Sequence, residues 1–242
     1  MNLAFIHHRN LIIVYAILFS SVFLSFGCEK GPETQDTKLV ALTFDDGPDS
    51  VCTAKILDIL KKEDVKATFF VLGKKVRMYP EIVKRECREG HLIGNHTFDH
   101  CYLPKVQFNK ILKNIDLAQS IIDSVCGYSS MLFRPTWGMI EQAQQDSLKC
   151  YGYKIVFWDV DIKQNKNNKN VYNTYDVPSI ISAITDNIKP NNIILLHDSN
   201  YGNKEDRMVI VQALPTIIDK LKAMGYTFVT ADKLIPGNKL TL

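Results

Sequence analysis

Two histidines and two aspartates carry the clearest chemical signal in this chain of 242 residues. His96 and His100 are four residues apart, a spacing at which both imidazoles can face one point. Asp45 and Asp46 are adjacent carboxylates that follow an apolar run. One carboxylate and two imidazoles supply three protein ligands to a metal and leave a coordination position open, as in catalytic zinc sites. The second carboxylate then stays free as a base, and the set predicts a hydrolase in which a metal ion activates water.

Two later segments also place polar groups directly after apolar runs. Arg134 can pair with Asp45 and hold it ionised and oriented. Trp137 offers an apolar platform for the face of a sugar, and its backbone N–H can meet a developing oxyanion. His197 follows a run of four aliphatic residues, and Asp198 or another carboxylate can raise its pKa and keep it protonated as a proton donor.

Each of these motifs taken alone also has a structural explanation. Aspartates before Gly47-Pro48 can form a turn or cap a helix, and histidines four residues apart are common on helix surfaces. Arg134 can form a surface ion pair, and a single histidine after a buried strand is usually structural. Their occurrence together, with complementary chemical roles, favours a catalytic site.

The elements that position these residues alternate along the chain. Strands are predicted at 39–44, 67–72, 91–94, 131–133, 154–158, 192–196 and 226–229. Helices are predicted near 52–63, 80–89, 106–125, 140–149, 176–188 and 207–224, and the apolar spacing of three and four is clearest at 106–125. This alternation predicts an α/β fold, a distorted barrel of about seven parallel strands covered by helices.

The polar residues fall at the carboxyl ends of the predicted strands. Asp45 and Asp46 follow the first strand, and the two histidines follow the third. The fourth strand is followed by Arg134. The fifth is followed by Asp159 and Asp161, and the sixth by His197 and Asp198. In a barrel these ends share one rim, which is where such folds place catalysis.

The composition limits the class of protein. Apolar residues make up 46% of the chain, which is enough for a full hydrophobic core. Charged residues make up 23%, a fraction typical of a folded globular protein. The net charge of +3 gives no case for nucleic-acid binding, and we expect a monomer.

The first 37 residues are predicted to form a leader and a tether. Residues 11–26 are almost wholly apolar, short for a membrane span but suited to a signal peptide. Gly27 before Cys28 resembles a lipoprotein cleavage site. We therefore predict a signal peptide at 1–27, a tether at 28–37 and a catalytic domain at 38–242. A lipid on Cys28 is expected to bind the membrane of the cell envelope. An ordinary secretory signal or an uncleaved anchor are the alternatives. The five other cysteines are packed thiols or form one or two bridges.

Four motifs together resemble those of the polysaccharide deacetylase family, also called carbohydrate esterase family four, over roughly residues 38–232. They are Thr43-Phe44-Asp45-Asp46-Gly47-Pro48, His96-Thr97-Phe98-Asp99-His100, Arg134-Pro135-Thr136-Trp137-Gly138 and Leu195-Leu196-His197-Asp198. The resemblance implies that Asp46, His96 and His100 bind a divalent metal, usually zinc, with cobalt, nickel or manganese as alternatives.

The resemblance also implies the other roles. Asp45 is the general base, Arg134 orients it, and His197 protonates the leaving amine. The Trp137 N–H stabilises the oxyanion. Substrate contacts are expected from Trp137, Pro135, Leu195 and Asp161.

The chain departs from the family pattern at two places. Thr136 stands where the third motif usually has a second proline. Gln164-Asn165 stands where an Asp-Trp pair is usual, which removes the carboxylate partner of the acid histidine and an aromatic wall. Asp159 or Asp161 are the candidates to replace that carboxylate.

The expected activity is removal of acetyl groups from an N-acetylated carbohydrate such as peptidoglycan or chitin. O-acetylxylan esterase, small-amide hydrolase and non-catalytic glycan-binding lipoprotein are the alternatives.

Overall fold

The computed structural model describes residues 37–162, 176–201 and 207–235 of the chain. The predicted leader, Cys28, the tether and the Gln164-Asn165 pair lie outside the described residues. No helix among the described residues combines the length and the apolar character needed to cross a membrane.

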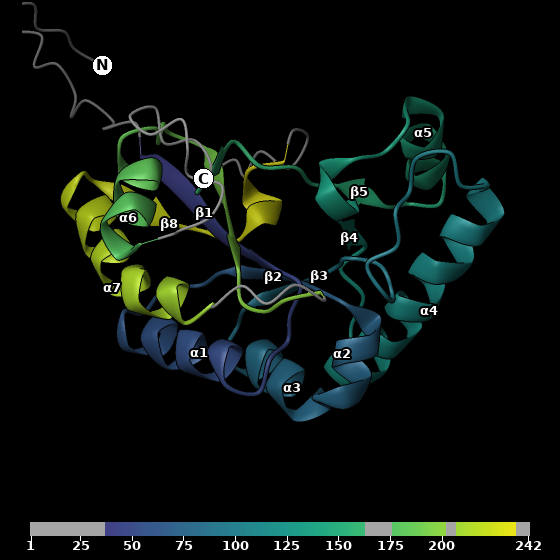
Figure 1. Ribbon diagram of the computed structural model, residues 1–242, viewed down its shortest axis with the longest axis horizontal. Helices are drawn as coiled ribbons and strands as arrows, with labels where there is room; N and C mark the ends of the chain where they lie inside the picture. The colour runs from purple at the N-terminus through teal and green to yellow at the C-terminus, as the bar shows by residue number, and fades with distance from the viewer. Residues whose placement is uncertain (1–36, 163–175, 202–206, 236–242) are drawn as a thin grey trace, which may run out of the picture. The chain divides into compact units, whose positions relative to one another are not determined.

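Strand β1 lies between β2 and β7 in a parallel sheet (Figure 1). The strands are β1 (Lys38–Asp45), β2 (Thr68–Val71), β3 (Leu92–Asn95), β4 (Leu132–Phe133), β5 (Lys154–Ile155), β6 (Val160–Asp161), β7 (Asn192–His197) and β8 (Tyr226–Phe228). The order along the sheet is β5-β4-β3-β2-β1-β7-β6, and β8 pairs with the first three residues of β1. The seven strands β1–β7 form a curled half-barrel, which confirms the predicted α/β fold.

The alternation of side chains along β1 separates the core from the site. Val40, Leu42 and Phe44 pack into the apolar cluster beneath the helices, where the Phe44 ring stacks on Phe69 of β2 at 5.1 Å. Thr43 and Asp45 belong to the other set of alternate residues, because successive side chains of a strand point to opposite faces. Polar groups therefore gather on the inner face of the half-barrel while the outer face holds the helices.

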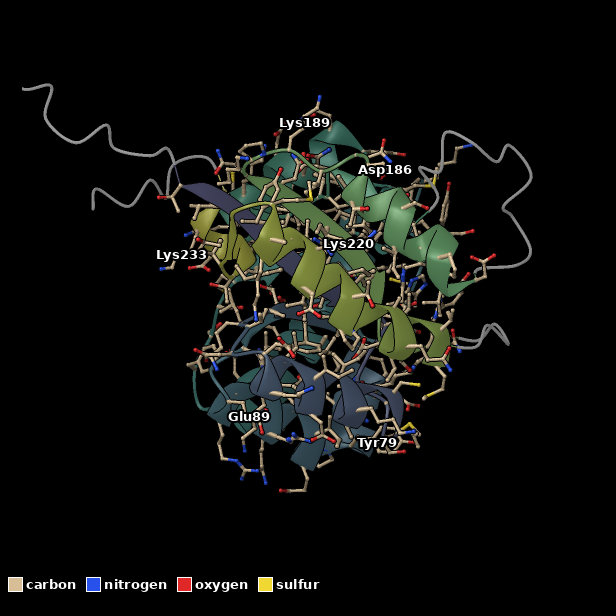
Figure 2. The ribbon with its side chains drawn as sticks, turned by 90° about the vertical axis from the view of Figure 1, so that its left-hand side faces the viewer. Tyr79, Glu89, Asp186, Lys189, Lys220 and Lys233 are labelled. Atoms are coloured by element: carbon tan, nitrogen blue, oxygen red, sulfur yellow. The ribbon has the colours of Figure 1, made fainter. Side chains whose placement is uncertain are left out.

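The described residues form seven α-helices around the sheet. They are α1 (Cys52–Lys62), α2 (Gly73–Met78), α3 (Pro80–Arg88), α4 (Phe108–Cys126), α5 (Gln142–Cys150), α6 (Val177–Thr185) and α7 (Met208–Ala223). In Figure 1, α7, α1, α3, α2 and α4 follow one another around the outside of the strands. Figure 2 shows Lys220 on the solvent side of α7, the helix whose opposite side packs in the core. Helix α2 was not predicted from the sequence.

The fifth predicted strand, 154–158, is wrong in its extent. Only Lys154 and Ile155 pair with β4, and a separate strand, β6, pairs with β7. The physical reason is Arg134, whose guanidinium donates to the carbonyls of Val156 and Phe157 at 3.1 Å each. These carbonyls bind a side chain instead of a neighbouring strand, so the ladder ends there.

The described cysteines are Cys52, Cys87, Cys101, Cys126 and Cys150, and no disulfide joins any two of them. The structure thus favours the packed-thiol alternative over bridges among these residues.

Glu86 of α3 is fully buried, and neither of its carboxylate oxygens has a hydrogen-bond partner among the described residues. Burial raises the pKa of Glu86 well above its ordinary value of 4.5, and the nearby charge of Asp198 adds to the shift. Because the folded form holds the proton more tightly than the unfolded form, Glu86 stabilises the fold below pH 4.5, and this contribution is lost as the pH rises through the folded pKa.

Replacing Glu86 by leucine is therefore expected to raise the free energy of unfolding at pH 8 by about 1–3 kcal/mol and by much less at pH 4. Urea unfolding of both proteins at the two pH values measures this. Glu81→Leu on the same helix is the matched control, because Glu81 is exposed and pairs only with Lys84 at the surface. An equal gain at pH 4 and pH 8 would contradict the explanation.

Candidate active site

The chain turns directly after β1, and the carboxylates of Asp45 and Asp46 both lie near Nε2 of His96, at 3.8 Å and 3.7 Å. Asp46 has a φ of 74°, a left-handed backbone conformation that ends the strand. Gly47 must follow, because a Cβ there would collide with the carboxylate of Asp198. Both aspartates are buried, Asp45 at 3% exposure and Asp46 at 1%.

His96 and His100 lie on a loop after β3 and not on a helix. Thr97 and His100 have φ values of 74° and 63°, which break any helical path. Asn95 holds the loop in place, since its Oδ1 accepts the N–H of Thr97 at 2.8 Å and its Nδ2 donates to the carbonyl of Ile115 in α4 at 2.9 Å. The sequence alone did not predict this anchor to α4.

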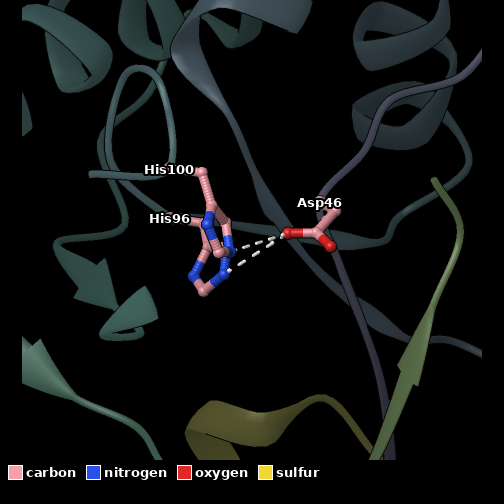
Figure 3. Close-up of side chains that lie close together, drawn as sticks. All are labelled: Asp46, His96 and His100. Carbon is pink, nitrogen blue, oxygen red and sulfur yellow. Dashed lines mark ion pairs between the residues drawn. The ribbon is translucent and has the colours of Figure 1, made fainter. Parts of the chain in front are cut away.

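The three predicted metal ligands converge (Figure 3). Nε2 of His100 is 3.2 Å from Oδ1 of Asp46, and Nε2 of His96 is 3.7 Å from the same oxygen. One ligand atom from each residue lies within 4.8 Å of the others, and all three residues are buried. The described residues therefore contain an Asp-His-His set whose lone pairs can share one ion.

The electrostatics of these residues fit a divalent cation. Oδ1 of Asp46 is buried without a hydrogen-bond donor among the described residues, so it is an anionic oxygen aimed at two imidazoles. Burial opposes its ionisation, but the interaction with His100 and the nearby rings of His96 and His197 lower the pKa of Asp46 to about 2. Burial lowers the pKa of His96, which favours the neutral form that binds metals.

Each imidazole is oriented by its surroundings. Nδ1 of His96 lies 2.8 Å from the carbonyl of Arg134, which holds a proton on Nδ1 and leaves the lone pair on Nε2. His100 is held by ring packing instead, stacked on Tyr201 with centroids 4.0 Å apart and edge-on to Trp137 at 4.2 Å.

Asp45 and Arg134 form a buried ion pair beside this cluster. Nη1 of Arg134 donates to Oδ1 of Asp45 at 2.8 Å and to Oγ1 of Thr43 at 2.7 Å. Arg134 is fully buried, and its guanidinium packs over the ring of Phe70 at 4.1 Å. Oδ2 of Asp45 lies 3.8 Å from Nε2 of His96. The predicted base thus has one oxygen held by arginine and the other turned to the ligand cluster.

His197 ends β7 directly beside Asp45, since the two residues are register partners. Burial is the largest influence on His197 and lowers its pKa. Asp46 raises the pKa, as expected of a nearby carboxylate, but does not offset burial, and Arg207 adds to the lowering. The expectation that a carboxylate keeps His197 protonated is therefore wrong in its net result. Nδ1 of His197 has no hydrogen-bond partner among the described residues.

Asp198 is turned away from His197. Its Oδ2 accepts the hydroxyl of Thr53 at 2.6 Å, and the carboxylate fills the space left by Gly47. Burial raises the pKa of Asp198 to about 7, although Thr53 and Lys75 act in the opposite direction. Asp198 therefore supports the turn after β1 rather than the proposed acid.

Of the two candidate replacement carboxylates, the structure excludes one. Asp159 comes before β6, and its Oδ2 accepts the N–H of Ile193 at 2.8 Å, near the amino end of β7. That is the end opposite to His197, so Asp159 does not lie at the carboxyl rim as predicted. Asp161 ends β6 opposite Leu195 and remains the candidate.

The predicted substrate contacts differ in exposure. Trp137 is 44% exposed, in a turn where its φ is 55°. Pro135 and Leu195 are buried, so their contact with a substrate stays a prediction. Sequence reasoning missed Tyr102 and Tyr201, which join Trp137 at this rim.

The chain is similar to known polysaccharide deacetylases. The polysaccharide deacetylase family model matches residues 32–156. A peptidoglycan-N-acetylglucosamine deacetylase of Bacillus cereus is 38% identical over 200 residues, which are 83% of this chain and 69% of that protein. A peptidoglycan-N-acetylglucosamine deacetylase PgdA of Listeria monocytogenes is 35% identical over 211 residues, and the match covers 41% of its length.

Solved structures show the same fold. A peptidoglycan N-acetylglucosamine deacetylase in complex with 4-naphthalen-1-yl-N-oxidanyl-benzamide has a TM-score of 0.75 and 37% identity over 83% of this chain and 89% of that one. A family 4 acetyl xylan esterase from Clostridium thermocellum, in complex with a cobalt ion, has a TM-score of 0.72 and 32% identity over 81% and 90%. The chain therefore belongs to the polysaccharide deacetylase family and is a hydrolase that acts on carbon–nitrogen bonds.

Proposed function

We propose that this protein releases acetate from N-acetylated sugars of a glycan of the peptidoglycan or chitin type, with a divalent metal. The observation that carries the proposal is the convergence of Asp46, His96 and His100 on one point with the carboxylate of Asp45 beside it. This arrangement supplies both a cation site and a separate base, which is what hydrolysis of an amide by an activated water requires.

Asp46, His96 and His100 would hold the cation, which when bound would supply Lewis acidity toward the acetyl carbonyl and toward water. Asp45 accepts the proton of the attacking water at Oδ2, the oxygen that Arg134 leaves uncovered. Arg134 positions Asp45. His197 delivers a proton to the departing nitrogen from its place beside Asp45. The Trp137 N–H binds the oxyanion that develops in the transition state.

Two kinds of relative support the choice of substrate. Peptidoglycan-N-acetylglucosamine deacetylase and a peptidoglycan-N-acetylmuramic acid deacetylase of Bacillus subtilis are both similar to this chain. O-deacetylation of xylan is the second candidate, favoured by the acetyl xylan esterase structure and by a bifunctional xylanase/deacetylase of Pseudobutyrivibrio xylanivorans. The leaving amine of an N-acetyl sugar requires a proton donor, which is the role given to His197.

We also propose that the protein is exported and that a lipid on Cys28 anchors it to the membrane of the cell envelope. The apolar run at 11–26, the Gly27-Cys28 junction and the cell-wall substrates named for its relatives support this. We propose zinc as the metal and a monomer as the active form.

Removal of the metal is expected to abolish acetate release, and added zinc is expected to restore it. The assay incubates the protein with N-acetylchitooligomers, peptidoglycan glycan strands and acetylxylan. Mass spectrometry of each glycan then follows the loss of its acetyl groups. Dipicolinate removes the metal, and cobalt, nickel and manganese are tested beside zinc. Activity that persists at full metal removal would falsify the mechanism.

The same panel separates the alternatives. Release from acetylxylan alone identifies an O-deacetylase. Binding to the glycans without acetate release from the zinc-loaded protein identifies a glycan-binding lipoprotein.

A further inference from the structure

Three exposed aromatic side chains adjoin the metal-ligand cluster. Tyr102 is 49% exposed, Trp137 44% and Tyr201 37%. Trp137 is in ring contact with Tyr102 at 5.7 Å and with Tyr201 at 5.6 Å. Large aromatic rings lose favourable burial when they face solvent, so a contiguous exposed group of them marks a binding surface.

This group, here called the aromatic platform (Tyr102, Trp137 and Tyr201), is continuous with the site. His100 stacks on Tyr201 and meets the edge of Trp137, so two members touch a predicted metal ligand. Tyr102 joins the platform through its ring contact with Trp137.

The platform is held in a defined geometry. Gly138 packs against the ring of Trp158, where a Cβ would collide, and this fixes the turn that presents Trp137. Oγ1 of Thr136 donates to the carbonyl of Cys101 at 2.6 Å. This bond ties the turn of Trp137 to the segment of Tyr102. Thr136 is the residue that replaces the usual proline, and proline has no side-chain donor for such a bond.

We propose that Tyr102, with Trp137, stacks on a sugar residue adjacent to the one that loses its acetyl group. The inference rests on the proposed function and adds a residue of this chain that contacts the neighbouring sugar. The apolar faces of pyranose rings pack on aromatic rings, while their hydroxyls stay in water. Tyr102 contacts Trp137, and Trp137 in turn contacts His100, so a sugar stacked on Tyr102 lies next to the ring that adjoins the ligand cluster.

The main test compares substrates of two sizes with the zinc-loaded full chain. Tyr102→Ala is expected to lower kcat/KM for tetra-N-acetylchitotetraose relative to kcat/KM for 4-nitrophenyl acetate by roughly tenfold, mainly through KM. Tyr102→Phe keeps the ring and should keep the ratio. Tyr151→Ala is the matched control, because Tyr151 is 56% exposed at the end of α5 and contacts Phe108 instead. An unchanged ratio in Tyr102→Ala overturns the proposal.

A binding measurement separates this proposal from the proposed function. Calorimetric titration of tetra-N-acetylchitotetraose into Asp45→Asn, which cannot turn the glycan over under the proposed mechanism, should give a Kd that weakens about tenfold when Tyr102→Ala is added. If wild-type protein releases no acetate but this weakening is found, the platform stands and the proposed function fails. If acetate is released and neither the ratio nor the Kd changes, the platform fails alone.

A third variant tests the tie between the two segments. Thr136→Val preserves the shape of the side chain and removes the bond to the Cys101 carbonyl. We expect a loss for the tetrasaccharide of the same sign as that of Tyr102→Ala, with zinc content unchanged. A Thr136→Val protein with wild-type affinity for the tetrasaccharide contradicts the positioning role of Thr136.

Discussion

Asp45→Asn is expected to lower acetate release by about 10²- to 10⁴-fold while the protein keeps its full zinc content. The amide retains the size of the carboxylate but cannot accept a proton from water. The three ligand atoms of Asp46, His96 and His100 do not include Asp45, so the metal site remains complete. Measurement of kcat by acetate release, together with zinc by atomic absorption, gives both results on one sample.

Asp46→Asn is the matched control, since it makes the same chemical change at the neighbouring residue. It removes the anionic oxygen that faces both imidazoles, and we expect loss of zinc together with loss of activity. If the effects of the two variants were exchanged, so that Asp45→Asn lost zinc and Asp46→Asn kept it, the assigned roles of the two carboxylates would be reversed.

Arg134→Met is expected to lower the free energy of unfolding by about 3–5 kcal/mol and to abolish activity. The substitution leaves the buried carboxylate of Asp45 without its partner and leaves the carbonyls of Val156 and Phe157 without their donors. A buried charge without a partner costs more than the ion pair itself contributes. Guanidinium unfolding of the two proteins under the same conditions measures the loss.

A double variant tests whether the unpaired charge causes this loss. Arg134→Met combined with Asp45→Asn should be more stable than Arg134→Met alone, because the second change removes the buried negative charge. Arg134→Lys keeps a positive charge but cannot reproduce the planar set of donors to Thr43, Asp45 and two carbonyls, so we expect only partial recovery. Equal stability of the single and double methionine variants would show that the loss comes from packing and not from charge.

Much of the site was predictable because its residues follow strands of a parallel fold. Parallel strands share one carboxyl edge, so a residue placed just after each apolar run is brought to the same rim whatever the loops do. The convergence of Asp46, His96 and His100, and the pairing of Arg134 with Asp45, follow from this topology.

Predictions that depended on side-chain direction were less successful. Asp198 follows His197 directly, but successive residues at the end of a strand point to opposite sides, and Asp198 binds Thr53 instead. Asp159 was placed at the wrong end because the break after β5 and the start of β6 depend on Arg134, a residue distant in sequence. Short strands of two residues carry no periodic signal from which such a break can be read.

The amino-acid sequence by itself predicted the parallel α/β fold and the meeting of two aspartates with two histidines, because apolar periodicity and the position of polar residues after strands are local properties of the chain. The division of the aspartates into a ligand, Asp46, and a base, Asp45, came from the resemblance to the family and stays a proposal. Only the tertiary structure decided that Asn95 anchors the histidine loop to α4, that His197 stands apart from Asp198, and that Tyr102, Trp137 and Tyr201 meet beside His100. These contacts join segments far apart in sequence, and their existence depends on the direction and packing of side chains, which no local pattern contains.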